Sequence, residues 1–316
     1  MADPRLRGVS PVLAVPFHED GSLDDLGFVS VVDHVLRTGV TSALLFGLAS
    51  EFHKLSDSER HQLTALLLER TNDRPEFAAI CSVTDHATWL ACRRAEAYEA
   101  AGADAINVLP PHFLAPSREA VVAHLDAVVG SVSIPVIVQH APGQTGSTLV
   151  ASDLRDLASR HPHFAIVKVE SVPPGPLIAD LKAAGISSFV GQAGLHLPEA
   201  VAAGAIGVQP GCSMIPLYQS MWSAAVAGDQ VALREQHAAV LPVLTVWMSG
   251  VERIVQAEKS LLHRSGVIAS DHCRAPGVSA EEDDEAWFAL VETRLAALRA
   301  VDAGPSRVVG PPRAGS

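Results

Sequence analysis

No apolar stretch of this chain is long enough to cross a membrane without charged residues or helix breakers. The first residues, Met-Ala-Asp-Pro-Arg, lack the apolar core of a secretory signal peptide. These absences argue against a membrane-spanning or secreted protein and predict a cytoplasmic one. With 316 residues, of which 48% are hydrophobic, the chain can instead bury a large core.

Cysteine is also scarce. The chain has only four cysteines, at positions 81, 92, 212 and 273, and no two of them form a C-x-x-C pair. In a cytoplasmic protein this spacing predicts reduced thiols rather than disulfides and offers no zinc-binding pattern. His161 and His163 have a spacing seen in metal sites, but they precede a predicted strand at the face opposite the expected active site, so we interpret them as surface residues. We expect no metal and no cofactor.

Basic residues are a minority, with 23 Lys and Arg against 35 Asp and Glu, a formal net charge of -12. An acidic chain with a pI near 5.5 is a poor partner for nucleic acid or for an anionic membrane. We therefore expect a small molecule as the main partner.

What the chain does contain, up to about Val226, is an alternation of short apolar runs with longer segments of helical period. The eight predicted strands are Ser10 to Val15, Ala43 to Phe46, Phe77 to Ser82, Ala105 to Leu109, Val136 to Gln139, Ala165 to Lys168, Ser188 to Val190 and Ile206 to Gln209. No Gly-rich dinucleotide fingerprint follows the first strand, which argues against an open doubly wound sheet. The pattern predicts an α/β fold with a (β/α)8 TIM barrel over residues 1–226.

Beyond Gly228 the pattern changes to helices alone. Helices are predicted over Gln230 to Met248, Glu252 to Arg264 and Glu285 to Leu298. We interpret residues 227–302 as a C-terminal helical domain that packs on the barrel. Residues 303–316 contain proline and glycine without a hydrophobic period, which predicts a disordered tail.

Lys168 is the most informative residue of the sequence. It closes the apolar run Phe164 to Lys168, on the sixth predicted strand. Active sites of barrels of this kind lie at the C-terminal ends of the strands. Burial favours the neutral form of a lysine amine, and a neutral amine can attack a carbonyl carbon to form a Schiff base. Lys168 is therefore the predicted nucleophile.

The loop after the second predicted strand is a second signal. It runs from Gly47 to Ser56 as a small-residue turn that leads into a capped helix. Such turns expose backbone N–H groups, which bind a carboxylate or a developing oxyanion. We expect residues 48–51 of this loop (Leu48, Ala49, Ser50 and Glu51) to bind substrate.

Other polar residues follow predicted strands and are expected to face the same cavity. They are Gln139, Gln192, Gln209 and His112. A lining rich in glutamine favours hydrogen bonds to a polar or neutral ligand. The sequence leaves open whether Glu170 points into the cavity or to solvent.

Taken together, several segments resemble the dihydrodipicolinate synthase and N-acetylneuraminate lyase family of class I Schiff-base aldolases, over about Gly8 to Pro276. The segments that carry the resemblance are Gly47 to Glu51, Val108 to Pro111, Pro142 with Thr145-Gly146, Ile166 to Lys168, and Lys259 to Pro276. The resemblance implies a (β/α)8 barrel with C-terminal helices and an imine between Lys168 and an α-keto acid such as pyruvate. It also implies a homo-oligomer, either a dimer or a tetramer built from dimers.

The chain departs from the family pattern at the substrate loop. Where the family has two hydroxyl residues that hold the keto acid's carboxylate, this chain has Leu48 and Ala49, which leaves backbone N–H groups and Ser50. The arginine that often follows the proline in synthases is replaced by Gln144. These changes argue against the usual pair of acidic substrates and against the lysine-pathway reaction.

A further departure concerns proton transfer. Gln139 stands where the family has a tyrosine that relays protons to and from the imine, and a glutamine cannot do this. The adjacent His140 titrates in a suitable range and is the predicted acid and base. Alternation along a strand directs His140 away from Gln139, so this role requires a strand end or a bulge.

The sequence thus predicts a lyase, an aldolase or dehydratase acting on a small polar carbonyl compound. One alternative is a cyclising dehydratase of an amino- or guanidino-carbonyl compound in a specialised pathway. A second alternative is a family member without catalysis that binds a small molecule, which the loss of the tyrosine and hydroxyls favours and the presence of Lys168 opposes.

Overall fold

The computed structural model describes residues 3–146, 149–280 and 284–302, so the predicted tail at 303–316 lies outside the described residues. Eight parallel strands form one sheet in the order β1-β8-β7-β6-β5-β4-β3-β2. The strands are β1 (Gly8–Val9), β2 (Ser42–Leu45), β3 (Ala78–Val83), β4 (Ala105–Val108), β5 (Val136–His140), β6 (Phe164–Val169), β7 (Ser187–Val190) and β8 (Gly207–Val208). The predicted (β/α)8 barrel is confirmed.

The barrel closes between its first and second strands through Val12. This residue forms parallel bridges with Leu44 of β2 and with Gly211, which follows β8. On either side of it, Leu44 N donates to Pro11 O at 2.8 Å and Leu13 N donates to Leu44 O at 2.9 Å. These contacts join the two ends of the sheet into a nearly closed barrel.

The prediction of a first strand from Ser10 to Val15 is wrong, because β1 is Gly8–Val9. Pro11 has no N–H to donate, so the regular ladder ends before it. The other seven predicted strands agree with the structure within one residue at each end.

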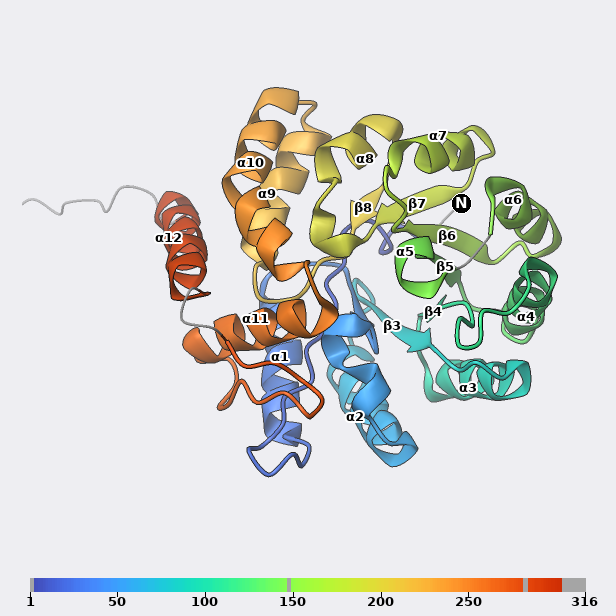
Figure 1. Cartoon of the computed structure of the whole chain (residues 1–316), viewed down its shortest axis with the longest axis horizontal. Helices are drawn as coiled ribbons and strands as arrows, with labels where there is room; N and C mark the ends of the chain where they lie inside the picture. Colours follow the sequence, from blue (N-terminus) through green and yellow to red (C-terminus); the bar gives the residue numbers. More distant parts are fainter. Residues whose placement is uncertain (1–2, 147–148, 281–283, 303–316) are drawn as a thin grey trace, which may run out of the picture.

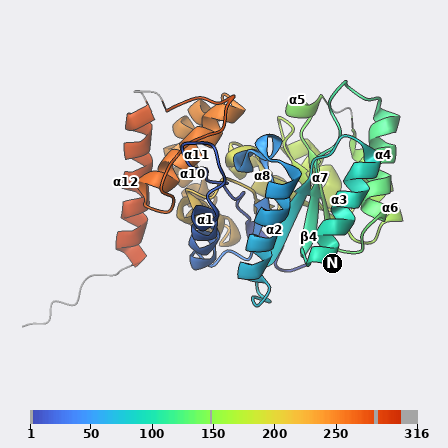
Figure 2. The ribbon, with the colours of Figure 1, turned by 90° about the horizontal axis from the view of Figure 1, so that it is seen from below.

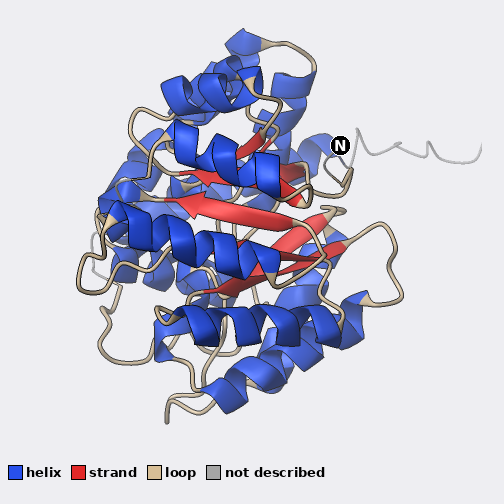
Figure 3. Ribbon diagram, turned by 90° about the vertical axis from the view of Figure 1, so that its right-hand side faces the viewer, coloured by secondary structure: helices blue, strands red, loops and turns tan. Residues whose placement is uncertain are grey.

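Helices surround the strands, as Figures 1 and 3 show. Those on the barrel are α1 (Asp25–Arg37), α2 (Asp57–Thr71), α3 (Thr88–Ala101), α4 (Arg118–Gly130), α5 (Pro142–Thr145), α6 (Ala151–Arg160), α7 (Gly175–Ala183) and α8 (Leu197–Ala203). Serine side chains cap two of these helices: Ser56 forms a capping box with Glu59, and Ser117 accepts a hydrogen bond from Ala120 N.

Four more helices follow the last strand and gather on one side of the barrel (Figures 1 and 2). They are α9 (Ile215–Val226), α10 (Gln230–Trp247), α11 (Val251–Arg264) and α12 (Asp284–Asp302). A boundary at 226/227, between α9 and α10, stays a prediction. Among the described residues, no helix is both long and apolar enough to span a bilayer.

The interior of the barrel is layered. Its lower layer is apolar and is formed by inward side chains of several strands, namely Leu6, Val12, Leu44, Ala78, Ile80, Ala105, Ile137, Ile166 and Phe189. One step closer to the C-terminal ends, the buried inward residues are polar, among them Ser82, Asn107, Gln139 and Lys168. A dry floor therefore supports a polar site at the end of the barrel where barrel enzymes perform their chemistry.

We expect Gly207→Ala to destabilise the fold by about 1–3 kcal/mol, because a β carbon there would clash with the Phe189 ring and with the backbone oxygen of Gly8, which has no room to move. Urea denaturation measures this change. Gly143→Ala is the matched control, since a β carbon there meets nothing within 4 Å. Equal midpoints for the two variants would contradict the close approach of β1, β7 and β8.

Candidate functional site

Lys168 lies on β6 with its side chain 5% exposed. In the register of the sheet it stands beside Gln139 of β5 and Phe189 of β7, so its side chain points to the same interior as theirs. Its Nζ is 3.4 Å from Oε1 of Glu170. The predicted nucleophile is thus buried in the barrel, next to a carboxylate.

Glu170 points into the barrel and not to solvent, which answers the question that the sequence leaves open. Its Oε2 accepts a hydrogen bond from Gln139 Nε2 at 2.8 Å, and its backbone oxygen accepts one from Gln192 Nε2 at 3.0 Å. A β carbon at Gly191 would clash with the Glu170 carboxyl, so the glycine makes room for it. Strand alternation could have predicted this orientation, because residues 168 and 170 share a face.

A chain of hydrogen bonds orients the Glu170 carboxylate from behind. Asn107 Nδ2 donates to Ser82 Oγ and to Gln139 Oε1, each at 3.1 Å, and the Gln139 amide in turn donates to Glu170. These residues come from three neighbouring strands and are buried. Gln139 therefore connects the barrel interior to the carboxylate beside Lys168.

A cavity of about 60 Å³ opens at Lys168. One water molecule occupies ~30 Å³ of the liquid, so the cavity accommodates a small group. Its lining consists of Val12, Leu48, Ala49, Lys168, Glu170, Gln192, Ala193, Gln209, Pro210, Gly211, Met248, Ile254 and Glu258. It includes the predicted residues Leu48, Ala49, Gln192 and Gln209.

Sequence reasoning missed Glu170 as a site residue and missed the C-terminal part of the wall altogether. Met248 follows α10, while Ile254 and Glu258 belong to α11. The side chains of α11 from Ile254 to Leu262 are all buried, including polar ones. Buried polar residues in a helix are a sign of a site, but the sequence alone does not indicate which of them reach the cavity.

Larger hollows lie away from this chemistry, among them two with volumes of several hundred Å³. One of about 400 Å³ is lined by Pro135, His163, Phe164 and Ser187, at the N-terminal ends of the strands. The other, of about 500 Å³, follows residues 270–280. Neither contains Lys168 in its lining, so we place the candidate active site at the smaller cavity.

Ser50 does not line the cavity. Its hydroxyl donates to Leu13 O at 2.6 Å and accepts from Phe46 N at 3.1 Å, which fixes the turn that carries Leu48 and Ala49. In the structure Ser50 supports the loop from behind.

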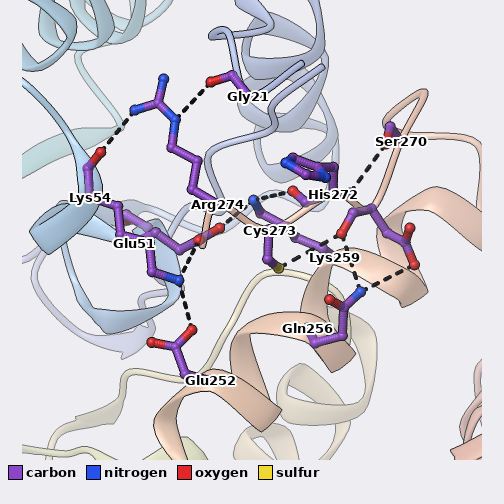
Figure 4. A network of polar contacts seen from close by, with 12 residues as sticks. Gly21, Glu51, Lys54, Glu252, Gln256, Lys259, Ser270, His272, Cys273 and Arg274 are labelled. Carbon is purple, nitrogen blue, oxygen red and sulfur yellow. Dashed lines mark hydrogen bonds and ion pairs between the residues drawn. The ribbon is translucent and has the colours of Figure 1, made fainter. Parts of the chain in front are cut away.

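Glu51 does not line the cavity either. It is fully buried, adopts a left-handed conformation with φ 50°, and forms ion pairs with Lys259 of α11 and, at 3.0 Å, with Lys54. Lys54 also pairs with Glu252 at 2.7 Å. Figure 4 shows these contacts, which join the substrate loop to the C-terminal helices.

Lys259 is the cation at the centre of this junction. Its side chain is fully buried, its Nζ donates to His272 O at 2.9 Å, and it lies 4.3 Å from the centre of the Phe17 ring. Burial lowers the pKa of Lys259, and the negative charge of Glu51 opposes that shift. The charged form of Lys259 is therefore stabilised by its contact with Glu51.

His140 and His112 lie apart from the cavity lining. His140 is paired in register with Val169, not with Lys168, and its Nε2 lies 3.1 Å from Leu149 O. Burial lowers the pKa of His140, while the hydrogen bond to Leu149 raises it. His112 contacts His86, with the ring centres 4.5 Å apart, and its Nδ1 lies 3.3 Å from Pro110 O.

Over the parts of the chain that the structure describes, no group of three or more His, Cys, Asp or Glu side chains is arranged to hold a metal ion. His161 pairs with Asp126 at 2.8 Å, and His163 Nε2 lies 2.7 Å from Val129 O. Both histidines therefore have protein partners.

The chain is similar in sequence to known proteins. The profile of the Dihydrodipicolinate synthetase family matches residues 5–292. The 4-hydroxy-tetrahydrodipicolinate synthase of Mycolicibacterium paratuberculosis is 30% identical over 247 residues, which cover 77% of this chain and 80% of the relative. The 4-hydroxy-tetrahydrodipicolinate synthase 2 of Streptomyces coelicolor is 28% identical, covering 88% of this chain and 92% of the relative.

Solved structures show the same fold. The dihydrodipicolinate synthase of Rhodopseudomonas palustris superposes with a TM-score of 0.84 at 20% identity, over 92% of this chain and 98% of that one. A prophage protein of the same family from E. coli K12, in complex with pyruvate, superposes with a TM-score of 0.81 at 21% identity, over 93% of this chain and 99% of that one.

We expect Lys259→Met to lower the free energy of unfolding by about 3–5 kcal/mol, because it leaves the Glu51 carboxylate buried without its main partner. Urea denaturation measures the loss, and adding Glu51→Gln to the variant should restore part of it. Arg93→Met, which removes an exposed ion pair with Glu96, is the control and should change stability by about 0.5 kcal/mol or less. A Lys259 variant as stable as this control would contradict the role of the junction.

Proposed function

Because the chain belongs to the dihydrodipicolinate synthetase family, whose members are class I aldolase-type lyases, we propose that Lys168 is the Schiff-base nucleophile of a lyase that acts on a small polar carbonyl compound. The observation that carries the proposal is the position of Lys168: buried, in a cavity, with its amine 3.4 Å from the Glu170 carboxylate. A buried lysine that lines a cavity and lies next to a carboxylate is a stronger candidate for a catalytic amine than a lysine at the surface.

In the proposed reaction the neutral Lys168 amine attacks the carbonyl carbon of the substrate. A C–N bond forms, and the carbonyl oxygen leaves as water with one proton from the amine and one that Glu170 had taken from the Lys168 ammonium, so that a protonated imine remains. The imine withdraws electrons from the neighbouring carbon, where a C–C bond breaks in retro-aldol cleavage or a hydroxyl leaves in dehydration. Hydrolysis of the imine then releases the product and restores the amine.

Each of these steps needs a group that moves protons, and we assign this role to Glu170. Its carboxylate lies 3.4 Å from the Lys168 amine, and the Gln139 amide holds it in place. The sequence pointed to His140 instead. That role would require the imidazole to leave Leu149 and turn toward the interior, so we treat His140 as the competing assignment.

The residues of the cavity support a substrate other than the usual acidic pair. Leu48 and Ala49 line it where hydroxyls would hold a carboxylate, and Gln192 and Gln209 offer amides. The named relatives are 4-hydroxy-tetrahydrodipicolinate synthases, so that reaction is the first to be compared in assays.

Two alternatives stay open to experiment. A cyclising dehydratase of an amino- or guanidino-carbonyl compound would suit the carboxylates of the cavity, and it need not form an imine. A family member without catalysis would bind its ligand equally well after Lys168→Ala. We also propose a homo-oligomer of two or four copies, which sedimentation velocity tests; a monomeric dihydrodipicolinate synthase variant is among the solved neighbours.

Borohydride reduction in the presence of candidate carbonyl compounds, among them pyruvate and small aldehydes, should add the mass of the reduced adduct to the peptide that contains Lys168. Lys168→Ala should abolish the adduct. Lys182→Ala, which removes an exposed lysine of α7, is the control for site selectivity. Adducts that persist in the Lys168 variant would reject this lysine as the nucleophile.

Glu170→Gln should form the imine more slowly but to the same final extent, and turnover should fall by about 10²–10⁴-fold, because the amide fills the same space and cannot transfer a proton. The final yield of trapped adduct measures imine formation. The rate at which the substrate's α-hydrogen exchanges with deuterium measures the proton transfer on which turnover depends. His140→Gln should leave both nearly unchanged. The reverse pattern in the two variants would assign the proton transfer to His140.

A further inference from the structure

We propose that Glu258 and Gln209 form a subsite for a basic nitrogen of the substrate, an amine or a guanidine, at the wall of the cavity opposite the reacting carbonyl. This inference deepens the proposed function and rests on it, because it names the class of carbonyl compound that the Lys168 cavity selects. Glu258 would be a residue that determines specificity, and it comes from the C-terminal helices rather than from a barrel strand.

The placement of Glu258 carries the first step. It lies on α11, is 1% exposed, and lines the cavity together with Lys168. Its Oε2 accepts a hydrogen bond from Ser213 N at 2.9 Å, whereas its Oε1 has no hydrogen-bond partner among the described residues. A β carbon at Gly211 would clash with this carboxyl, so the carboxyl rests directly on the chain that leaves β8.

The second step comes from Gln209. Its Nε2 donates to Ser10 Oγ at 3.4 Å, and its Oε1, like that of Glu258, is buried without a partner in the described part of the chain. Both residues line the same cavity, and the unpaired atom of each is a buried hydrogen-bond acceptor. Buried polar atoms normally have partners, so a ligand that completes this site must supply N–H or O–H donors.

Charge selects among such donors. The charged side chains in the lining are Lys168, Glu170 and Glu258. A protonated imine keeps the single positive charge of Lys168, which Glu170 balances at close range. The Glu258 carboxylate then has no cation, and an unpaired buried carboxylate is costly. An ammonium or guanidinium of the ligand would pair with it, whereas a hydroxyl would not.

The electrostatics of the empty site agree with this assignment. Burial raises the pKa of the Glu258 carboxyl, and the hydrogen bond from Ser213 only partly opposes the shift. A cation bound at this place would favour the charged form of the carboxyl and lower its pKa again, whereas a substrate carboxylate would supply no such compensation.

Three aldehydes of similar size test the proposal: 3-aminopropanal, butanal and 3-oxopropanoate, which carry a positive, a neutral and a negative end. The measured quantity is the concentration that gives half-maximal borohydride trapping on Lys168. We expect the wild-type protein to favour 3-aminopropanal over butanal by about 10-fold or more, as a charge-assisted hydrogen bond allows. Glu258→Gln should lose this preference and keep its response to butanal. Glu252→Gln changes the same charge on the same helix outside the lining and should keep the preference.

Equal trapping of the positive and neutral aldehydes by the wild-type protein, or a preference that survives in Glu258→Gln, would overturn the subsite. Stronger trapping of 3-oxopropanoate than of 3-aminopropanal would overturn it too, and would assign Glu258 as a neutral hydrogen-bond donor to an anion.

A separate probe distinguishes failure of the subsite from failure of the lyase chemistry. 1,3-Diaminopropane has no carbonyl group, so its binding to the wild-type protein, measured by calorimetry, does not depend on an imine. Binding that Lys168→Ala retains and Glu258→Gln loses would support the subsite even if no aldehyde is trapped. If Glu258→Gln fails to fold, calorimetry of the wild-type protein in buffers of different ionisation enthalpy replaces it: proton release on binding supports the pairing with Glu258, and its absence rejects it.

Discussion

Strand alternation on β6 is the constraint from which the site follows. Lys168 lies in β6 and Glu170 directly follows it, where the Glu170 N–H still donates to His140 O of β5, so the two side chains keep the strand alternation and both enter the barrel. The lysine therefore meets a carboxylate of its own segment, at 3.4 Å, in a place that solvent hardly reaches. The amide chain from Ser82 through Asn107 and Gln139 then needs only to orient that carboxylate, and this is what the three hydrogen bonds do.

The second requirement is a wall, and the barrel strands supply only part of it. Met248, Ile254 and Glu258 close the side of the cavity that faces the C-terminal helices. The ion pair between Glu51 and Lys259 holds α11 against the loop that carries Leu48 and Ala49. The loop with Leu48 and Ala49 and helix α11, which lie far apart in the sequence, thus form one wall of the cavity.

The sequence was sufficient for the barrel, for seven of its strands and for the place of Lys168 near the end of the sixth, because apolar period and strand ends are local signals. It failed at the first strand, where Pro11 interrupts the ladder, and it grouped Ser50 and Glu51 with the substrate residues although both face the supporting structure. The part of the cavity wall that α11 supplies was not predicted from the sequence. Which face of a helix meets a cavity depends on how the helix packs, and no pattern within α11 states that.

Glu258 and Lys259 are consecutive residues of α11, and they point to different tasks: one faces the cavity, the other anchors the loop through Glu51. A shift of α11 along its axis, or an inserted residue before it, would move both at once. The proposed selectivity of Glu258 and the stability supplied by Lys259 therefore depend on the position of one helix. A change of substrate that moved α11 would also disturb the ion pair between Glu51 and Lys259, whereas a change confined to the barrel loops that do not carry Glu51 would leave that ion pair in place.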